Sequence, residues 1–136
     1  MNLIKFDPNR ISEATSEDFK VLIVEDDLEF AEVIYINIST AVENAKCFFA
    51  SNLEEAKFFL DKIRFDCVIL DLKLNHESGE DLLPVIAASE SNKCAPIIVS
   101  SAFADDQIEG NKRILKVLKK PYEFADLVGA VSGVSG

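Results

Sequence analysis

Basic residues are scarce in this chain of 136 residues, where 14 Lys and Arg stand against 24 Asp and Glu and leave a formal net charge of −10. Phosphate contacts along a nucleic acid require clustered Lys and Arg, so we expect no direct nucleic-acid-binding surface. Cysteine is also scarce. Cys47, Cys67 and Cys94 stand in apolar contexts without metal-ligand spacing, and we interpret them as small buried side chains in a reducing compartment. The single histidine, His76, is interpreted as a solvated loop residue.

Long apolar runs and glycine-rich loops are missing as well. No run approaches the length of a membrane-spanning helix, and residues 1–6 lack the pattern of a signal peptide, so we expect a cytoplasmic protein without membrane contact. The five glycines form neither a dinucleotide-binding loop nor a Walker loop. The chain does have a hydrophobic content of 49%, which is enough for one folded domain with a buried core.

An apolar run at residues 67–70 leads directly into Asp71. Such a run suits a strand buried on both faces of a parallel sheet, and ligands of these sheets gather at the carboxyl ends of the strands. Taken alone, Asp71 could equally cap the strand or turn the chain. Three further apolar runs also end in polar residues that could serve a common site. Glu25 and Asp26 follow residues 21–24, Ser100 and Ser101 follow 97–99, and Lys119 and Lys120 follow 117–118.

Strands and helices are expected to alternate along the chain. The expected strands are residues 20–24, 46–50, 66–71, 96–101 and 114–119. The expected helices are residues 28–42, a helix that begins after an N-cap at Ser51 with Glu54 in a capping box, residues 80–89, a short helix within residues 102–113, and residues 124–131. This alternation demands parallel strands joined by right-handed crossovers. We predict an α/β fold with a doubly wound five-stranded parallel sheet, order 2-1-3-4-5, and helices on both faces. Residues 1–19 would form an N-terminal arm, 20–131 the folded domain and 132–136 a C-terminal tail.

This strand order would bring Glu25, Asp26 and Asp71 together at one edge of the sheet. Three close carboxylates repel one another, and a bound divalent cation would remove the conflict. Because the ligands are oxygens and no Cys or His is nearby, we expect Mg²⁺, or Mn²⁺ in its place. Lys120 and Ser101 could hold the oxygens of a phosphoryl group at the same point. The predicted reaction is attack of the Asp71 carboxylate on phosphorus to give an aspartyl phosphate.

Four short motifs carry a resemblance to a known family. They are VEDD at 24–27, ILDLKL at 69–74 with Gly79 further on, VSSA at 99–102 and KKPY at 119–122. In this order and spacing, the chain resembles the receiver domain of a two-component response regulator over roughly residues 20–131. The resemblance implies a flavodoxin-like fold for this part of the chain.

The resemblance also implies roles for individual residues. Asp71 would be the phosphoacceptor and a Mg²⁺ ligand. The further Mg²⁺ ligands would be Glu25, Asp26 and the backbone carbonyl of Lys73. Ser101 would be the switch hydroxyl, and Lys120 would be the lysine beside the phosphoryl group. Phosphoryl transfer would come from a histidine kinase or a histidine phosphotransfer protein, and slow self-catalysed hydrolysis would follow. The consequence would be a switch in the interaction with an unknown output partner.

Three features depart from the family pattern. Asn75 stands where the family usually has proline, Val117 stands where an aromatic residue normally couples to the switch hydroxyl, and residues 102–119 form a shorter segment than usual. These departures leave open a receiver-like scaffold that binds partners without phosphorylation. Two other classes fit less well. A phosphatase of the haloacid dehalogenase type should have a second Asp where Lys73 stands, and the acid pair after the first strand would repel the phosphate of a flavodoxin-like cofactor.

Overall fold

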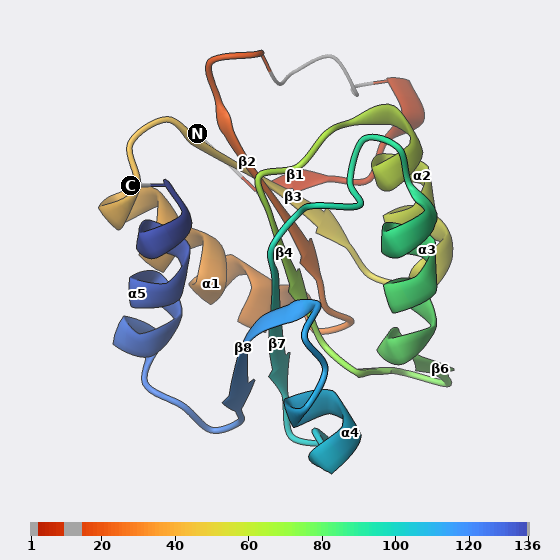
Figure 1. Ribbon diagram of the computed structural model, residues 1–136. Helices are drawn as coiled ribbons and strands as arrows, with labels where there is room; N and C mark the ends of the chain where they lie inside the picture. The colour runs from red at the N-terminus through yellow and green to blue at the C-terminus, as the bar shows by residue number, and fades with distance from the viewer. Residues whose placement is uncertain (1–2, 10–14, 136) are drawn as a thin grey trace.

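The computed structural model of the chain describes residues 3–9 and 15–135. The helices are α1 (Leu28–Ala41), α2 (Leu53–Lys62), α3 (Leu82–Ala88), α4 (Asp106–Glu109) and α5 (Phe124–Ser135), with a 3-10 turn (Gly79–Asp81) before α3. The main sheet contains β1 (Ile4–Lys5), β2 (Phe19–Val24), β3 (Ala45–Ala50), β4 (Cys67–Leu70), β7 (Ile97–Ser101) and β8 (Ile114–Lys119), and a small hairpin contains β5 (Lys73–Leu74) and β6 (Glu77–Ser78). Helices α1 and α5 cover one face of the main sheet, and α2 and α3 cover the other (Figure 1).

The main sheet has the order β1-β3-β2-β4-β7-β8, and every neighbouring pair is parallel. Without β1, this is the predicted order 2-1-3-4-5, so the predicted fold class is confirmed. β2 and β4 lie side by side with Val24 opposite Leu70. The residues that follow these two strands therefore emerge together at the carboxyl edge of the sheet, where ligands of doubly wound folds bind.

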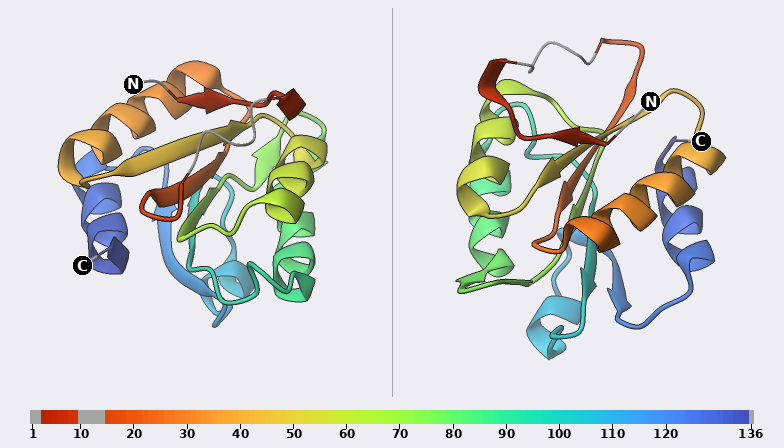
Figure 2. Two further views of the ribbon diagram at one scale, coloured as in Figure 1. Left: turned by 90° about the horizontal axis from the view of Figure 1, so that it is seen from above. Right: turned by 180° about the vertical axis from the view of Figure 1, so that it is seen from behind.

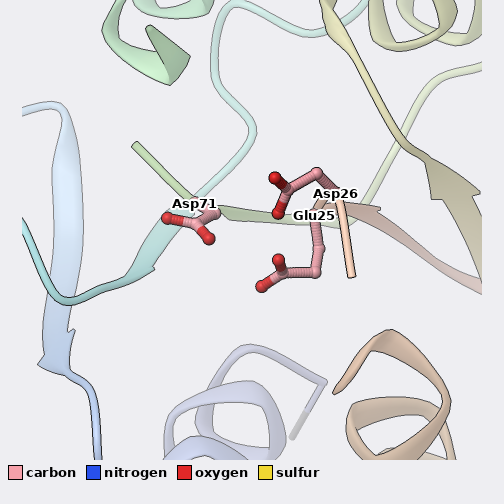
Figure 3. A group of neighbouring side chains, drawn as sticks. All are labelled: Glu25, Asp26 and Asp71. Atoms are coloured by element: carbon pink, nitrogen blue, oxygen red, sulfur yellow. The ribbon is translucent and has the colours of Figure 1, made fainter. Parts of the chain in front are cut away.

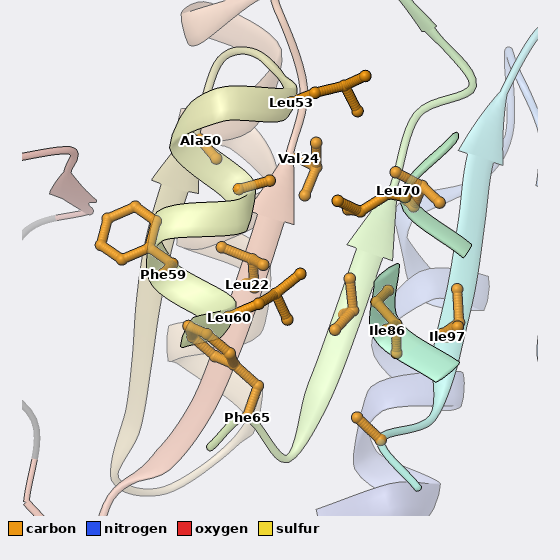
Figure 4. Packing of buried hydrophobic residues seen from close by; sticks show 14 of the residues in the cluster. Leu22, Val24, Ala50, Leu53, Phe59, Leu60, Phe65, Leu70, Ile86 and Ile97 are labelled. Atoms are coloured by element: carbon orange, nitrogen blue, oxygen red, sulfur yellow. The ribbon is translucent and has the colours of Figure 1, made fainter. Parts of the chain in front are cut away.

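The central strands are apolar throughout because helices bury both of their faces. Leu22 of β2 belongs to the core on the side of α2, together with Phe59 and Leu60 (Figure 4). Its neighbour Ile23 belongs to the core on the opposite side, together with Ile34 of α1. Alternate residues thus enter two different clusters, and polar side chains are confined to the strand ends, as the two serines of β7 are.

The N-terminal arm adds one strand that the sequence did not predict. β1 pairs in parallel with the outer edge of β3 (Figure 2). Phe6 follows it and packs edge-on against Phe58 and Phe59 of α2, with ring centroids 5.1 and 5.7 Å apart. The sheet therefore has six strands rather than five. Residues 1–2 and 10–14 of the predicted arm, and residue 136 of the predicted tail, lie outside the described residues.

Two helix ends differ from the prediction. Asn52, not Ser51, is the N-cap of α2, and its side-chain oxygen accepts a hydrogen bond from the backbone N–H of Glu55. The capping box predicted with Glu54 is therefore wrong by one position. The carboxylate of Glu55 reaches back to the backbone N–H of Ser51 at 2.9 Å instead. At the other end of the chain, α5 continues to Ser135 through residues that were predicted to fray.

The cysteines fall into two environments. Cys47 and Cys67 are buried in the sheet as predicted, and burial raises the pKa of each thiol to about 12. Cys94 is exposed, so the prediction that it is buried was wrong. It lies in the connection that leads into β7, outside the strands whose apolar pattern predicts burial. Within the described ranges, no helix is both long enough and apolar enough to span a membrane.

Candidate functional site

Asp71 stands at the centre of the carboxyl edge of the sheet. Its backbone N–H donates to the carbonyl of Val24 at 2.9 Å, which extends the ladder between β4 and β2 by one residue. The backbone N–H of Glu25 donates to the carbonyl of Ala50 at 3.0 Å and fixes the end of β2 against β3 in the same way. The acids are therefore attached to the most rigid part of the molecule, because the strands that carry them are paired on both sides.

Glu25, Asp26 and Asp71 form a compact acidic group, as the strand order predicted. One carboxylate oxygen from each residue lies within 4.8 Å of the other two (Figure 3). Glu25 is 3% exposed and Asp71 is 6% exposed, whereas Asp26 is half-buried at the rim. The three carboxylates line a cavity of about 470 Å³ that Lys73 and Lys120 also line.

Lys120, the first residue after β8, reaches this acidic group with its side chain. Its Nζ atom lies 2.7 Å from Oε1 of Glu25 and 3.0 Å from Oδ2 of Asp71. The backbone N–H of Lys120 donates to the carbonyl of Ser101 at 3.1 Å, which ties the end of β8 to the end of β7. The ammonium also lies 4.2 Å from the centroid of the Phe30 ring, which comes from the first turn of α1.

Burial and charge shift the titration of this pair. Burial raises the pKa of Glu25 to about 7, and the negative charge of Asp71 adds to this effect while the hydrogen bond from Lys120 opposes it. Burial alone would lower the pKa of Lys120, but its hydrogen bonds to Glu25 and Asp71 together with their charges raise it. The site therefore holds its lysine as a firmly protonated cation beside a carboxyl that is unusually easy to protonate.

The segment after Asp71 contributes two backbone features to the site. The backbone N–H of Asn75 donates to Oδ2 of Asp26 at 2.9 Å, and Asn75 has φ of 54°. Proline could not make this hydrogen bond, because it has no N–H, and could not adopt this positive φ, because its φ is fixed at a negative value. Asparagine can do both. Gly79 packs directly against the backbone of Asp71, where an added Cβ would lie 2.0 Å from the Asp71 carbonyl oxygen.

The two serines that end β7 face different surroundings. The hydroxyl of Ser101 is fully buried and accepts a hydrogen bond from the backbone N–H of Phe103 at 3.2 Å. The hydroxyl of Ser100 is 2.7 Å from the hydroxyl of Tyr122. Val117, which replaces the aromatic expected from the family pattern, packs instead against the core on the side of α2. A hydroxyl and an aromatic residue are therefore paired here, but through Ser100 and Tyr122.

The sequence missed four contributors to the site. Asn75, His76 and Phe103 line the same cavity as the acids, and the Phe103 ring lies 4.8 Å from Nζ of Lys73. Phe30 lies in the first turn of α1 and packs on the core, and an apolar residue in a helix gives no signal of a role in a site. Lys73, whose backbone carbonyl is a predicted metal ligand, donates its backbone N–H to Oδ1 of Asp71 at 3.1 Å.

The donor set of the cavity fits a hard divalent cation. All three convergent side chains are carboxylates, and the exposed His76 is the single imidazole of the chain. Oxygen ligands without sulfur or paired imidazoles favour Mg²⁺ over softer metals. Lys120 places one positive charge against two of these carboxylates and offsets part of their mutual repulsion.

Comparison with known proteins gives one consistent family. The family model described as "Response regulator receiver domain" matches residues 21–132. The transcriptional regulatory protein DcuR of Escherichia coli K12 is 31% identical over 117 residues, which cover 83% of this chain and 48% of DcuR. The chain therefore spans about half the length of this curated relative.

Solved structures show the same architecture. A putative response regulator from Chloroflexus aurantiacus is 27% identical with a TM-score of 0.75, over 87% of this chain and 98% of that one. The receiver domain of the sensor histidine kinase PA1611 from Pseudomonas aeruginosa is 22% identical with a TM-score of 0.74, over 88% and 98% of the two chains. That structure contains a magnesium ion coordinated in its active site cleft.

Proposed function

Because the chain belongs to the receiver-domain family of response regulators, we propose that Asp71 is its phosphoacceptor and that a bound Mg²⁺ assists the transfer. The observation that carries this proposal is the convergence of Glu25, Asp26, Asp71 and Lys120 on one cavity at the carboxyl edge of the sheet. Glu25, Asp26, Asp71 and the backbone carbonyl of Lys73 would hold the ion. Mn²⁺ has the same preference for oxygen ligands and would serve in its place.

In the proposed reaction, a carboxylate oxygen of Asp71 attacks phosphorus and the bond from phosphorus to the donor's leaving group breaks. The donor keeps the electron pair of that bond, and Asp71 becomes a mixed anhydride. When bound, the divalent cation supplies positive charge that offsets the charge on the phosphoryl oxygens. Lys120 would turn its ammonium from the carboxylates to one phosphoryl oxygen, and the hydroxyl of Ser101 would donate a hydrogen bond to another.

The donor in the cell would be a histidine kinase or a histidine phosphotransfer protein, since these are the phosphodonors of receiver domains. We further propose that residues 20–131 form the receiver unit common to the family, to which the arm of residues 1–19 adds β1 and the segment 132–136 adds the last turn of α5. The family match over residues 21–132 supports these boundaries. None of the similar proteins supports a receiver-like scaffold that works without phosphorylation.

Intact-mass measurement with the small phosphodonor acetyl phosphate tests the proposal. The wild-type chain should gain one phosphoryl group in the presence of Mg²⁺ and almost none in EDTA. Asp71→Asn should gain none, because an amide is a poor nucleophile of the same shape. Asp61→Asn is a matched control, because Asp61 is an exposed acid on α2 whose nearby cation, Lys62, is its neighbour in the chain. Undiminished labelling of Asp71→Asn would contradict the assignment.

A further inference from the structure

The face of the Phe30 ring is turned toward the ammonium of Lys120, with Nζ 4.2 Å from the ring centroid. We propose that Phe30 is a positioning residue, whose ring holds the Lys120 ammonium over Asp71 while the phosphoryl group is transferred. This inference rests on the proposed phosphoryl transfer to Asp71. A cation that lies within about 6 Å of a ring centroid is attracted by the negative face of the aromatic quadrupole.

The ring is itself held firmly in place. Asp27 caps α1 and accepts a hydrogen bond from the backbone N–H of Phe30, so the ring projects from the first turn of a helix that begins directly after the acid pair. Tyr122 meets the Phe30 ring nearly at right angles, with centroids 6.2 Å apart and an interplanar angle of 88°. The Phe124 ring also packs against the Phe30 ring, with centroids 5.6 Å apart.

Tyr122 extends this support to the sheet. Its hydroxyl lies 2.7 Å from the hydroxyl of Ser100 at the end of β7, and it follows Lys120 by two positions. Tyr122 therefore connects the Phe30 ring, which faces the lysine, to the backbone that carries the lysine. This arrangement restricts the movement of the ammonium relative to the sheet edge more than the lysine stem alone could.

The ring differs from the other two partners of Lys120 in what happens during the reaction. Glu25 and Asp71 hold the ammonium in the metal-free site, at 2.7 and 3.0 Å. A divalent cation would engage both carboxylates, and Asp71 would also take the phosphoryl group. The face of Phe30 binds neither, so it remains available to the ammonium throughout. We therefore expect the ring to matter most when the carboxylates are occupied.

The first measurement needs no phosphodonor. Protons above an aromatic face shift upfield, so the ε-methylene protons of Lys120, identified by their absence in Lys120→Ala, should resonate upfield in the NMR spectrum of the wild-type chain. Phe30→Tyr keeps the ring and should keep the shift. Phe30→Leu should lose it, whereas Phe58→Leu should retain it, because the Phe58 ring lies on α2 and faces a different lysine, Lys62.

The second measurement is the rate of Mg²⁺-dependent labelling by acetyl phosphate. Phe30→Leu should slow labelling about fivefold, on the scale of one cation–π contact, and Phe30→Tyr should restore most of the rate. Phe58→Leu, which removes a ring that faces Lys62 outside the site, should label at close to the wild-type rate. In a Lys120→Ala background, Phe30→Leu should have no further effect, because a residue that acts through the lysine has nothing to position once the lysine is gone.

The two measurements separate the possible failures. An unshifted Lys120 signal in the folded wild-type chain would overturn the inference, whatever the labelling result. The inference would also be overturned if Phe30→Leu slowed labelling by the same factor in the Lys120→Ala background, because the ring would then act without the lysine. If the wild-type chain takes no phosphoryl group at all, the proposed function fails, and the NMR shift still decides whether Phe30 positions the lysine.

Discussion

At the scale of single residues, the carboxyl of Glu25 links the metal-free site to the metal-bound one. It is 3% exposed, and its Oε1 atom lies 2.7 Å from Nζ of Lys120. A buried carboxylate is costly unless an opposite charge faces it, so the ammonium stabilises the metal-free site. In the proposed metal-bound site, a divalent cation would compete with Lys120 for this carboxylate. An ammonium released in this way would be available to a phosphoryl group on Asp71.

The affinity for Mg²⁺ should therefore depend on pH near neutrality. The proposed metal site would require ionised Glu25, whereas burial raises the pKa of this carboxyl to about 7. We expect the affinity to rise about tenfold from about pH 6 to about pH 8 because binding must release the proton. Isothermal titration calorimetry across this range measures the effect. Glu25→Gln should bind Mg²⁺ more weakly and with little pH dependence, and an unchanged pH dependence in that variant would assign it to another group.

The same raised pKa fixes the sign of a stability effect. A group that binds its proton more tightly in the folded state stabilises the fold at low pH and loses that contribution as the pH rises. In the absence of metal, the free energy of unfolding should thus fall as the pH increases from about 4.5 to about 7, and Glu25→Gln should reduce the fall. Urea unfolding in EDTA at several pH values measures this free energy for the wild-type chain and for the variant.

Asn75 and Phe30 show which residue roles a sequence does not reveal. The predicted acids could be found because each follows an apolar strand, and the strand order determines that they meet. Asn75 contributes through its backbone N–H, which every residue except proline possesses, so its side chain gives no signal. Phe30 occupies a helix position that packs on the core, and its contact with Lys120 depends on how α1 lies across the sheet.

At the scale of elements, the segment from Asp71 to α3 holds the proposed phosphoacceptor by close backbone packing. β5 and β6 form a hairpin, and the N–H of Gly79 after it donates to the carbonyl of Leu72 at 2.8 Å. This approach brings the α-carbon of Gly79 so close that a Cβ would lie 2.0 Å from the carbonyl oxygen of Asp71. Glycine is therefore required by contact with rigid backbone, since no Gly in the described residues has a positive φ.

Gly79→Ala should destabilise the protein by about 1–3 kcal/mol, because the methyl group overlaps backbone that cannot move without shifting Asp71. Gly133→Ala is the matched control. Gly133 lies in α5 with nothing near its added Cβ, so alanine there should stabilise by about 0.5–1 kcal/mol through helix propensity. Urea unfolding measures both. Equal effects of the two variants would show that Gly79 does not pack against Asp71 as described.

The predictability of the elements follows the length of their patterns. Strands β2, β3, β4 and β7 could be predicted because each has at least three consecutive apolar residues that are buried, whereas β8 has only apolar pairs around Lys116. The order could be predicted because it is the commonest doubly wound arrangement for a domain of this size. β1 has two residues and no pattern of its own. It is a strand because β3 offers an open edge and Phe6 packs on α2, which are tertiary effects. The cap of α2 was misplaced by one residue because Ser51 and Asn52 are both good N-caps.

At the scale of the whole molecule, the acids that produce the net charge of −10 do not all affect stability to the same extent. Most acids are exposed and interact weakly with one another through solvent, where salt screens them. The three acids of the site are close together and partly desolvated, so their repulsion acts on the fold directly. Lys120 relieves it for Glu25 and Asp71, whereas Asp26 has the backbone N–H of Asn75.

Mg²⁺ should raise the melting temperature of the protein more than NaCl does at matched ionic strength. Mass action on the native state alone gives about 2.7 kcal/mol at a concentration roughly a hundredfold above the dissociation constant, which corresponds to several degrees. Asp26→Asn keeps an oxygen for the N–H of Asn75 and removes one charge, so it should raise the metal-free melting temperature slightly and shrink the increment from Mg²⁺. Asp61→Asn should leave the increment unchanged. Equal increments from Mg²⁺ and NaCl would mean that the three carboxylates do not bind the metal.

The central claim is that the phosphoryl group is carried by Asp71 and by no other acid of the cluster. After labelling with acetyl phosphate and Mg²⁺, borohydride reduces an aspartyl phosphate to homoserine, and peptide mass spectrometry then locates the reduced residue. We predict homoserine at position 71 in the labelled wild-type chain, with Glu25 and Asp26 unchanged and no homoserine in an EDTA control. Reduction at Glu25 or Asp26, or a labelled chain in which Asp71 is intact, would contradict the account.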